Sequence, residues 1–270
     1  MRRRALLALS GALLVCGCAG AVHQLPQVSD GEVAVALAEV RSGGRGLQHR
    51  SASDDEVVET LRVAAGRVRA TALQVCREMS VGVCDWQFRI SRERTMNASA
   101  MANGLIVLNR GLVEYAANEE EIAMVIAHEI AHQAANHVAQ GQRNQIIGAA
   151  IGAALAGLAG AAASSGDSGS ANTIRAAAEL GARAGAWVGH LSFSKEQERE
   201  ADYIAALILY RAGVDLAKAR GLLVTMARES GRTQTNMLDS HPVGPERLAA
   251  WDRAVAEIRA SNGRLPRRAS

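Results

Sequence analysis

A chain of 270 residues suits one domain, or one domain with appendages, and 49% apolar with 21% charged residues is typical of a soluble globular protein. The formal net charge of +3 equals the contribution of Arg2, Arg3 and Arg4, and the remaining chain is neutral, which gives no reason to expect nucleic acid as a partner. Because only 3% of the residues are aromatic, the core has to be built mainly from Ala, Leu, Val and Ile.

The first residues have the features of a secretory signal peptide. The three arginines precede an apolar stretch, residues 5–15, which is too short to cross a bilayer as a helix. It ends in Val-Cys-Gly-Cys at 15–18, which resembles the bacterial lipobox. This resemblance implies a signal peptide at 1–17 and lipidation of Cys18, and Ala19 after it implies sorting to the outer membrane. The alternative is an ordinary signal peptide with an unrelated cysteine.

The next segment is expected to separate the lipidated cysteine from the folded domain. Residues 18–52 are predicted to form a tether, with a short helix at 33–40. A capping box at 53–56 then starts an amphipathic helix over about 53–80. We therefore expect the domain to begin at residue 53.

Two cysteines flank the turn after this helix. Cys76 and Cys84 are expected to form a disulfide, because two cysteines on either side of a turn tend to pair in an oxidising compartment. Two buried free thiols are the alternative. A metal-binding role is not expected for them, since no further cysteine lies near in the sequence.

A small sheet is predicted after the disulfide. Apolar residues alternate over 86–91, which is typical of a strand. Asn103-Gly104 is a strong signal for a hairpin turn, so two short strands are expected at about 96–101 and 105–109.

The next helix carries the most informative motif of the chain. After a short helix at 111–117, Asn118 is expected to cap a helix that runs to about residue 138, with three glutamates in its first turn. This helix contains His-Glu-Ile-Ala-His at 128–132. Two imidazoles four residues apart share one helix face, so they are able to bind one metal ion, and the glutamate beside them reaches a water molecule on that metal.

An Ala- and Gly-rich segment at 146–163 has several possible structures. A mobile flap over the active site, a surface that rests on lipid, and a tightly packed helix or helical hairpin all fit its sequence. A membrane span, which would make the protein an integral protease, is a further interpretation. A flexible loop at 164–171 and a helix at 173–191 are expected to follow.

The C-terminal part is predicted to be helical up to a basic tail. The three expected helices begin at a capping residue or a proline and cover 194–213, 215–230 and 245–259. The domain is expected to end at 262, and the tail, 263–270, is expected to be disordered.

A third metal ligand is predicted on the helix that starts at residue 194. A catalytic zinc site takes three protein ligands and leaves one position for water, and His128 and His132 supply two. Glu198 and Asp202 lie on one helix face, so one can bind zinc while the other accepts the N–H of a ligating histidine. This Glu-x-x-x-Asp arrangement is that of the gluzincins. Glu200 lies about 200° around the helix from Glu198 and is not expected to share the site.

Glu129 is the expected general base, which takes a proton from a zinc-bound water and passes it to the leaving amine. His137 lies about 140° around the same helix from His132, so it is expected to be a packed or surface residue and not a ligand. For the three other histidines outside these motifs no partner is expected; they are His23, His49 and His190.

Taken together, these motifs resemble peptidase family M48, zinc metallopeptidases, in their bacterial periplasmic lipoprotein type. The resemblance covers about 53–260 and is carried by 97–104, 128–132 with His137 following, 198–202, and His241-Pro242 with Arg247. It implies an α+β fold, mainly α, with a small edge-strand sheet packed on the active-site helix.

The resemblance also implies roles for single residues. One zinc ion per chain would be bound by His128, His132 and Glu198, with Asp202 behind them. His241 would lie near the zinc and either aid the transition state or block the water position. Arg247 would shape the substrate cleft. An extended substrate would pair with an edge strand formed by Asn97, Ala98, Ser99 and Ala100.

The function predicted from these observations is a zinc endopeptidase on the periplasmic side of the outer membrane of a Gram-negative bacterium. It would be held there by its lipid anchor and would cleave unfolded or misassembled envelope proteins, without a nucleic-acid partner. The alternative is a lipoprotein chaperone or assembly factor for outer-membrane proteins with little proteolysis.

Overall fold

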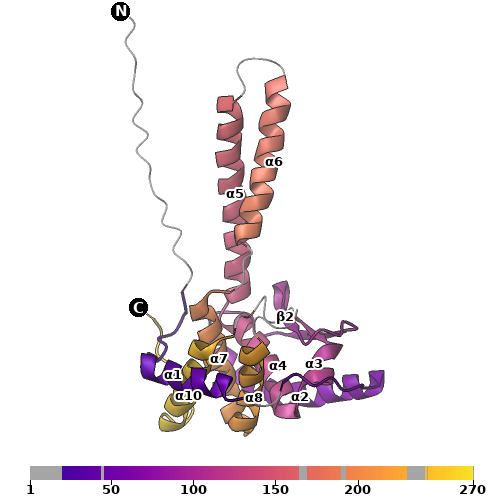
Figure 1. Cartoon of the computed structure of the whole chain (residues 1–270), viewed down its shortest axis with the longest axis vertical. Coiled ribbons are helices and arrows are strands. Elements are labelled where there is room, and N and C mark those ends of the chain that lie inside the picture. The colour runs from indigo at the N-terminus through magenta and orange to yellow at the C-terminus, as the bar shows by residue number, and fades with distance from the viewer. Residues whose placement is uncertain are drawn as a thin grey trace, which may run out of the picture.

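Two buried helices form the centre of the domain in the computed structural model, which describes residues 20–43, 46–163, 169–189, 193–229, 241 and 243–269. Helix α4 (Glu119–Ala134) packs against α7 (Lys195–Arg211), as Figure 1 shows. Helices α2 (Asp54–Met79) and α8 (Leu216–Glu229) cover α4, and α10 (Pro245–Ala260) covers α7. The predicted signal peptide at 1–17, Cys18 and His190 lie outside the described residues.

The expected caps and the aliphatic core are confirmed. Asn118 Oδ1 accepts the backbone N–H of Glu121, and Ser194 forms a capping box with Gln197. Nearly every residue of α4 is buried, including its alanines and isoleucines. A helix that is surrounded on all sides needs small aliphatic side chains, which explains the scarcity of aromatic residues.

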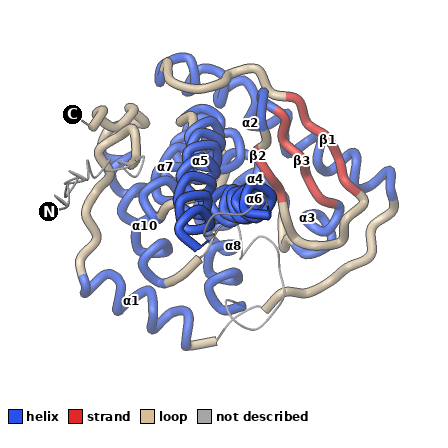
Figure 2. Tube along the Cα trace, turned by 90° about the horizontal axis from the view of Figure 1, so that it is seen from above, coloured by secondary structure: helices blue, strands red, loops and turns tan. Residues whose placement is uncertain are grey.

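The predicted three-stranded sheet is also confirmed. Its order is β1-β3-β2, with β1 (Gln87–Ser91) parallel and β2 (Ala98–Ala100) antiparallel to β3 (Leu105–Asn109). The turn between β2 and β3 has φ 59° at Asn103 and 78° at Gly104, the left-handed conformation that Asn-Gly favours. Strand β2 is at an edge of this sheet and contacts α4 (Figure 2). A short helix, α3 (Arg110–Tyr115), joins β3 to the approach to α4.

The expected single helix from 118 to 138 is wrong, because the chain breaks after α4. Asn136 has φ 63°, and a new helix, α5 (His137–Ala163), begins directly after it. The left-handed residue changes the direction of the chain, so the angular position of His137 relative to His132 cannot be taken from one continuous helix. The consequence for His137 is described with the metal centre.

The Ala- and Gly-rich segment forms one arm of a helical hairpin, one of the structures predicted for it. Helix α5 packs along α6 (Gly169–Gly189), and the pair projects from the rest of the domain (Figure 1). The two backbones approach so closely that a Cβ on Gly181 would clash with the carbonyl oxygen of Gly152. Residues 169–171, expected in a loop, are the first turn of α6, and 164–168 lie outside the described residues.

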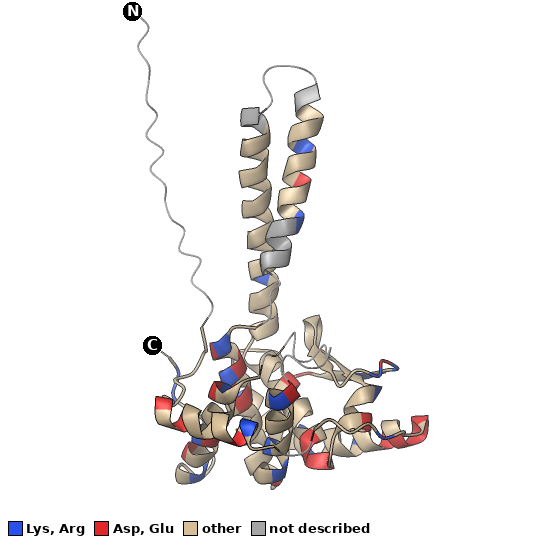
Figure 3. Cartoon of the chain, in the orientation of Figure 1, with Lys and Arg blue, Asp and Glu red and all other residues tan. Residues whose placement is uncertain are grey.

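The surface of this hairpin is poor in charge. In Figure 3 few positions along the hairpin are coloured as charged residues, whereas such positions are frequent on the helices below it. Apolar side chains are exposed along it instead: Ile146, Ile151, Leu155, Leu158 and Leu180. In the part of the chain that the structure describes, no helix combines the length and the hydropathy needed to cross a bilayer.

The expectations for a tether at 18–52 and a disordered tail at 263–270 are wrong over the described parts of both segments. The short helix expected at 33–40 is present as α1 (Asp30–Arg41), but it packs against α10 and α8. Ahead of it, His23 forms a β-bridge with Arg268, and the N–H of Ala269 donates to the carbonyl of Val22 at 2.9 Å. No local sequence pattern predicts pairing between segments at opposite ends of the chain. The composition of each segment, taken alone, therefore suggested that it was free of contacts.

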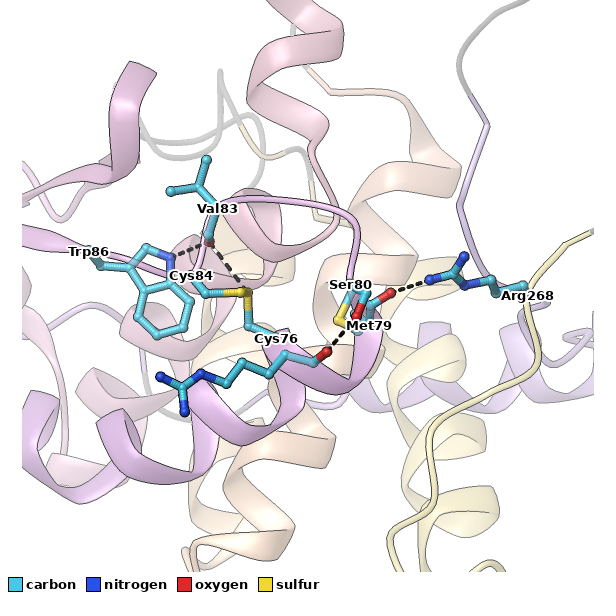
Figure 4. Close-up of a disulfide and its surroundings, with 8 residues drawn as sticks. Cys76, Met79, Ser80, Val83, Cys84, Trp86 and Arg268 are labelled. Carbon is cyan, nitrogen blue, oxygen red and sulfur yellow. Dashed lines mark hydrogen bonds between the residues drawn. A yellow bond between two sulfur atoms is a disulfide. The ribbon is translucent and has the colours of Figure 1, made fainter.

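Cys76 and Cys84 form the predicted disulfide, with Cα atoms 5.7 Å apart, and the loop around it is held by further contacts (Figure 4). Trp86 Nε1 donates to the carbonyl of Val83 at 2.8 Å. The guanidinium of Arg268 donates to the carbonyl of Met79. The disulfide therefore connects the end of α2 to the start of the sheet at a point that also contacts the C-terminal segment.

Replacing both cysteines, Cys76→Ala with Cys84→Ala, should lower the free energy of unfolding by about 2–3 kcal/mol, because the closed loop restricts the unfolded chain. Urea denaturation measures this change. A reductant should lower the stability of the wild type by a similar amount and leave the double variant unchanged. Equal stability of oxidised wild type and variant would show that the bond does not contribute.

Candidate metal centre

The buried face of α4 presents three chemically active side chains. His128, Glu129 and His132 are each at most 1% exposed. The spacing of four residues places the two imidazoles one above the other, and their Nε2 atoms lie 3.1 Å apart. Both rings therefore direct the same nitrogen to one point between α4 and α7.

Helix α7 brings a carboxylate to that point. Glu198 Oε2 lies 3.4 Å from His128 Nε2, and Glu198 Oε1 lies 3.4 Å from His132 Nε2. Tetrahedral metal bonds of about 2.0–2.2 Å place the ligand atoms roughly 3.3–3.6 Å apart. The separations among these three side chains are close to that spacing, so they fit a single zinc-sized ion.

A fourth side chain comes from the segment before α10. His241 Nδ1 lies 3.3 Å from His128 Nε2 and 2.8 Å from Glu198 Oε1, and the ring is buried. The ligand atoms of the four residues all lie within 4.8 Å of one another, so the cluster is able to hold one metal ion.

Asp202 and Arg247 lie behind this cluster. Asp202 Oδ1 is 3.0 Å from His128 Nδ1, the contact predicted from the spacing of Glu198 and Asp202. Arg247 Nε and a terminal nitrogen donate to the same carboxylate at 2.5 and 2.8 Å, and Arg247 Nη1 lies 2.6 Å from Glu198 Oε2. Arg247 thus lies against Glu198 and Asp202, and it also lines a cavity beside them.

The charges of this buried group fit a divalent cation. Three carboxylates, of Glu129, Glu198 and Asp202, face one guanidinium, of Arg247. With neutral imidazoles these groups carry two uncompensated negative charges, and buried charges need a counter-charge or a metal. Soft and borderline nitrogen ligands with one carboxylate are the donor set that zinc prefers.

The carboxylates also control the protonation of the cluster. Burial alone would lower the pKa of His128, but hydrogen bonds to Asp202 and Glu198 raise it to about 9. For His132, burial dominates and holds the pKa well below its ordinary value. The pKa of Glu198 is well below its usual range because Arg247 and His241 outweigh the effect of burial. The raised pKa of His128 indicates that the cluster holds a proton on this imidazole, which a metal has to displace in order to bind there.

Glu129 lies beside the cluster and contacts the sheet as well. Its Oε2 accepts the backbone N–H of Ala100 at 2.6 Å, and its Oε1, which is buried, lies 3.5 Å from His241 Nε2. No described residue forms a hydrogen bond with that Oε1 atom. The carboxylate is therefore positioned between the metal cluster and the edge strand β2.

The predicted substrate residues lie on and beside this strand. Ala98 and Ala100 are in β2. In an antiparallel pair, alternate residues direct their N–H and C=O groups to the neighbouring strand, and the residues between them direct theirs outward. The backbone groups of Ala98 and Ala100 are of the second kind and point to the free edge of the sheet. The contact between Ala100 N–H and Glu129 shows that this edge faces the metal cluster. The backbone N–H and C=O groups of Ser99 face β3. The side-chain oxygen of Asn97 accepts a hydrogen bond from the N–H of Ala98.

A cavity of about 290 Å³ adjoins the metal cluster. It lies between the start of α7 and the start of α10, and its lining includes Glu198, Val243 and Arg247. Because a metal ligand forms part of its wall, the cavity is placed to receive a side chain of a bound molecule.

Sequence reasoning missed a second buried cluster beside the first. His137, expected to be a packed or surface residue, is buried and contacts His132 Nδ1 at 3.0 Å and Glu200 at 3.0 Å. His23, for which no partner was expected, is buried against Glu200 at 2.6 Å. His49 also has a partner, Glu114, at 3.4 Å. A histidine and a glutamate far apart in the chain carry no signal of their contact.

The aromatic ring of Phe193 lies against His132. Phe193 stacks on His132 with the ring centres 3.8 Å apart and the planes inclined by 22°. Phe193 lies two positions before the start of α7. The sequence offers one indication of its role, which is that it is an isolated aromatic residue in a chain with few of them. The stacking restricts the rotation of the His132 imidazole.

Comparisons with known proteins agree with this geometry. A family model, Peptidase family M48, matches residues 63–255. The chain is 32% identical over 173 residues to a beta-barrel assembly-enhancing protease of Escherichia coli (strain K12), covering 61% of the chain and 33% of that protein. It is 27% identical over 194 residues to the mitochondrial metalloendopeptidase OMA1 of Arabidopsis thaliana, covering 72% of the chain and 36% of that protein.

A third relative is closer to this chain in length. The chain is 31% identical over 176 residues to the metalloprotease LoiP of Escherichia coli (strain K12), which covers 59% of each protein. The first relatives are longer, and the chain spans about a third of their length. The shared part is the region that contains the metal cluster.

Substituting any one of the three ligands that come from α4 and α7 should abolish tight zinc binding, because two of these three would remain and His241, from the segment before α10, would have to complete the site. In His128→Ala, His132→Ala or Glu198→Ala, the zinc content after desalting should fall from close to one ion per chain to near zero. Mass spectrometry of the metal measures it. His49→Ala, a half-exposed histidine at another site, is the matched control and should retain zinc; full zinc content in a ligand variant would contradict the assignment.

Proposed function

The chain belongs to peptidase family M48, and on this premise we propose that it is a zinc-dependent endopeptidase that hydrolyses peptide bonds in unfolded or misassembled cell-envelope proteins. The observation that carries the proposal is the position of Glu129, a carboxylate held between a metal cluster and a free strand edge. His128, His132 and Glu198 are the proposed metal ligands. This arrangement combines a metal site, a base and a substrate platform.

Glu129 is proposed as the general base. A zinc ion at this site would polarise the scissile carbonyl and lower the pKa of a water molecule. Glu129 Oε1, which no described residue engages in a hydrogen bond, is the atom that accepts the proton of the attacking water. Burial by α4 and β2 keeps bulk water from this carboxylate, and the N–H of Ala100 fixes its orientation.

Strand β2 is proposed to bind the substrate as an added strand. An extended peptide would pair with the outward-facing backbone of Ala98 and Ala100, which places its own backbone over Glu129. It would pair through the carbonyl groups of these residues and would compete for their N–H groups, which donate to Asn97 and to Glu129. Backbone pairing does not select a sequence, so unfolded segments of many proteins fit. The cavity beside Glu198 and Arg247 then accommodates one side chain of the bound peptide.

His241 is proposed to guard the site in its resting form. Its Nδ1 lies as close to His128 and Glu198 as these ligands lie to one another, so its ring fills the fourth position of the cluster. Its Nε2 lies 3.5 Å from Glu129. Displacement of the ring would open the fourth position and place the imidazole where it can stabilise an anionic transition state.

The proposed place of work is the periplasmic side of the outer membrane. The relatives named beta-barrel assembly-enhancing protease point to envelope proteins as substrates. The Val-Cys-Gly-Cys sequence supports a lipid anchor on Cys18, and several acyl chains on one residue give stable attachment. The described chain starts at Gly20, so the anchor would lie within a few residues of the folded domain.

A chaperone or assembly factor with little proteolysis is the second candidate. It is favoured by the exposed apolar residues of the α5–α6 hairpin, since such residues bind unfolded chains. The intact carboxylate of Glu129 at the metal cluster favours the protease.

Glu129→Gln separates the two candidates. The amide cannot accept the proton of water, so kcat/KM for a fluorescently labelled unfolded protein should fall at least about 100-fold while the zinc content is unchanged. Release of labelled peptides measures the rate. If the zinc-loaded variant cleaves at the wild-type rate, the protease assignment is wrong and the binding function remains.

Cys18→Ala tests the proposed anchor. Without acyl chains the protein should move from the membrane pellet to the soluble fraction after cell lysis and alkaline carbonate extraction. Immunoblotting of both fractions measures the distribution, and Cys76→Ala serves as a control for loss of a cysteine elsewhere. A Cys18→Ala protein that stays in the pellet would show that something other than this lipid holds it to the membrane.

A further inference from the structure

A chain of buried polar contacts leads away from the metal cluster on the side of His132. The Nδ1 atom of His132 lies 3.0 Å from Nδ1 of His137, and Nε2 of His137 lies 3.0 Å from Oε2 of Glu200. All three side chains are completely buried. None of them has a role in the proposed hydrolysis except His132, which is a metal ligand.

The Nε2 atom of His132 faces the metal cluster, which determines the direction of every proton in this chain. Metal binding uses the lone pair of Nε2, so Nδ1 of His132 carries the proton and donates it. His137 must then accept with Nδ1, which leaves its Nε2–H to donate to Glu200. One arrangement of protons satisfies all the contacts.

On this basis we propose that His137 and Glu200 are positioning residues for the metal ligand His132, and that the N-terminal segment holds them in place. A ligating histidine is oriented by the partner of its second ring nitrogen, and a carboxylate at the end of such a chain makes the ligand more basic. Here the partner is a histidine, and the carboxylate acts through it. The inference rests on the proposed function in so far as it takes zinc as the metal.

Glu200 is held from the other side by the first residues of the described chain. Its Oε2 accepts the N–H of Val22 at 2.7 Å, and its Oε1 accepts the N–H of His23 at 2.9 Å. The ring of His23 contacts the same Oε1 at 2.6 Å. Two backbone N–H groups and the rings of His23 and His137 therefore meet at the Glu200 carboxylate, which fixes its orientation.

The N-terminal segment is in turn fixed by the C-terminus. His23 forms a β-bridge with Arg268, whose guanidinium donates to the carbonyl of Met79 at the end of α2. The segment that follows the proposed lipidation site is therefore part of the support of a metal ligand. A chain without residues 20–28 would lose the contacts of Val22 and His23 and would free Glu200 to rotate.

The substitution Glu200→Gln tests the positioning role. Its amide keeps the shape but removes the anionic acceptor, so zinc should dissociate about 10-fold more readily or more, as measured by competition with a chromophoric chelator. Glu114→Gln is the matched control, because Glu114 is equally buried and also contacts a histidine, His49, and an arginine, but lies away from the metal. A purely structural role predicts that both variants lose stability and keep wild-type zinc affinity, which would overturn the proposal.

A second measurement needs no substitution and so decides the question even if Glu200→Gln does not fold. Long-range 1H–15N correlation spectra of the zinc-loaded wild type read the tautomer of each imidazole. His132 should carry its proton on Nδ1, and His137 should be neutral with its proton on Nε2. A proton on Nδ1 of His137 would overturn the proposal.

Neither readout depends on catalysis. A wild type that binds zinc and shows the expected tautomers but does not cleave unfolded protein would refute the proposed function and leave this inference in place. A wild type that cleaves, with unchanged zinc affinity in Glu200→Gln, would refute the inference and leave the function.

Discussion

The contact between α4 and α7 is the constraint on which the rest of the structure depends. It places two imidazoles and three carboxylates in a buried region, where uncompensated charge is unfavourable. Arg247 supplies one positive charge from α10. A divalent cation would balance the remainder and replace the proton that the raised pKa of His128 indicates, so the packing of the core and the binding of a metal are linked electrostatically.

The parts of this site that local sequence patterns predict are those fixed by helix geometry. A spacing of four residues puts His128 above His132, and Glu198 above Asp202, whatever the rest of the chain does. Capping residues located the starts of α4 and α7, and Asn103-Gly104 located the hairpin that presents β2. Each of these signals lies within a few residues of the feature that it predicts.

The parts that were not predicted depend on contacts between distant segments. His23 and Glu200 are 177 positions apart, and the bridge from His23 to Arg268 joins the two ends of the chain. Nothing in the local sequence distinguishes a histidine that meets such a partner from a solvated one. The break at Asn136 is intermediate: a single left-handed residue ends α4, and an asparagine in an otherwise helical pattern is too weak a signal to end a helix on its own.

The backbone of His241 and its ring are held by different contacts, which bears on how the fourth position opens. Arg247 Nη1 donates to the carbonyl of His241 at 3.3 Å, while the ring contacts His128 and Glu198. A shift of the backbone would break the contact with Arg247 and disturb the only guanidinium that balances Glu198 and Asp202 among the described residues. Rotation about the side-chain bonds of His241 moves the ring and leaves that balance intact. Opening of the site therefore requires less rearrangement by rotation of this ring than by movement of the segment that carries it.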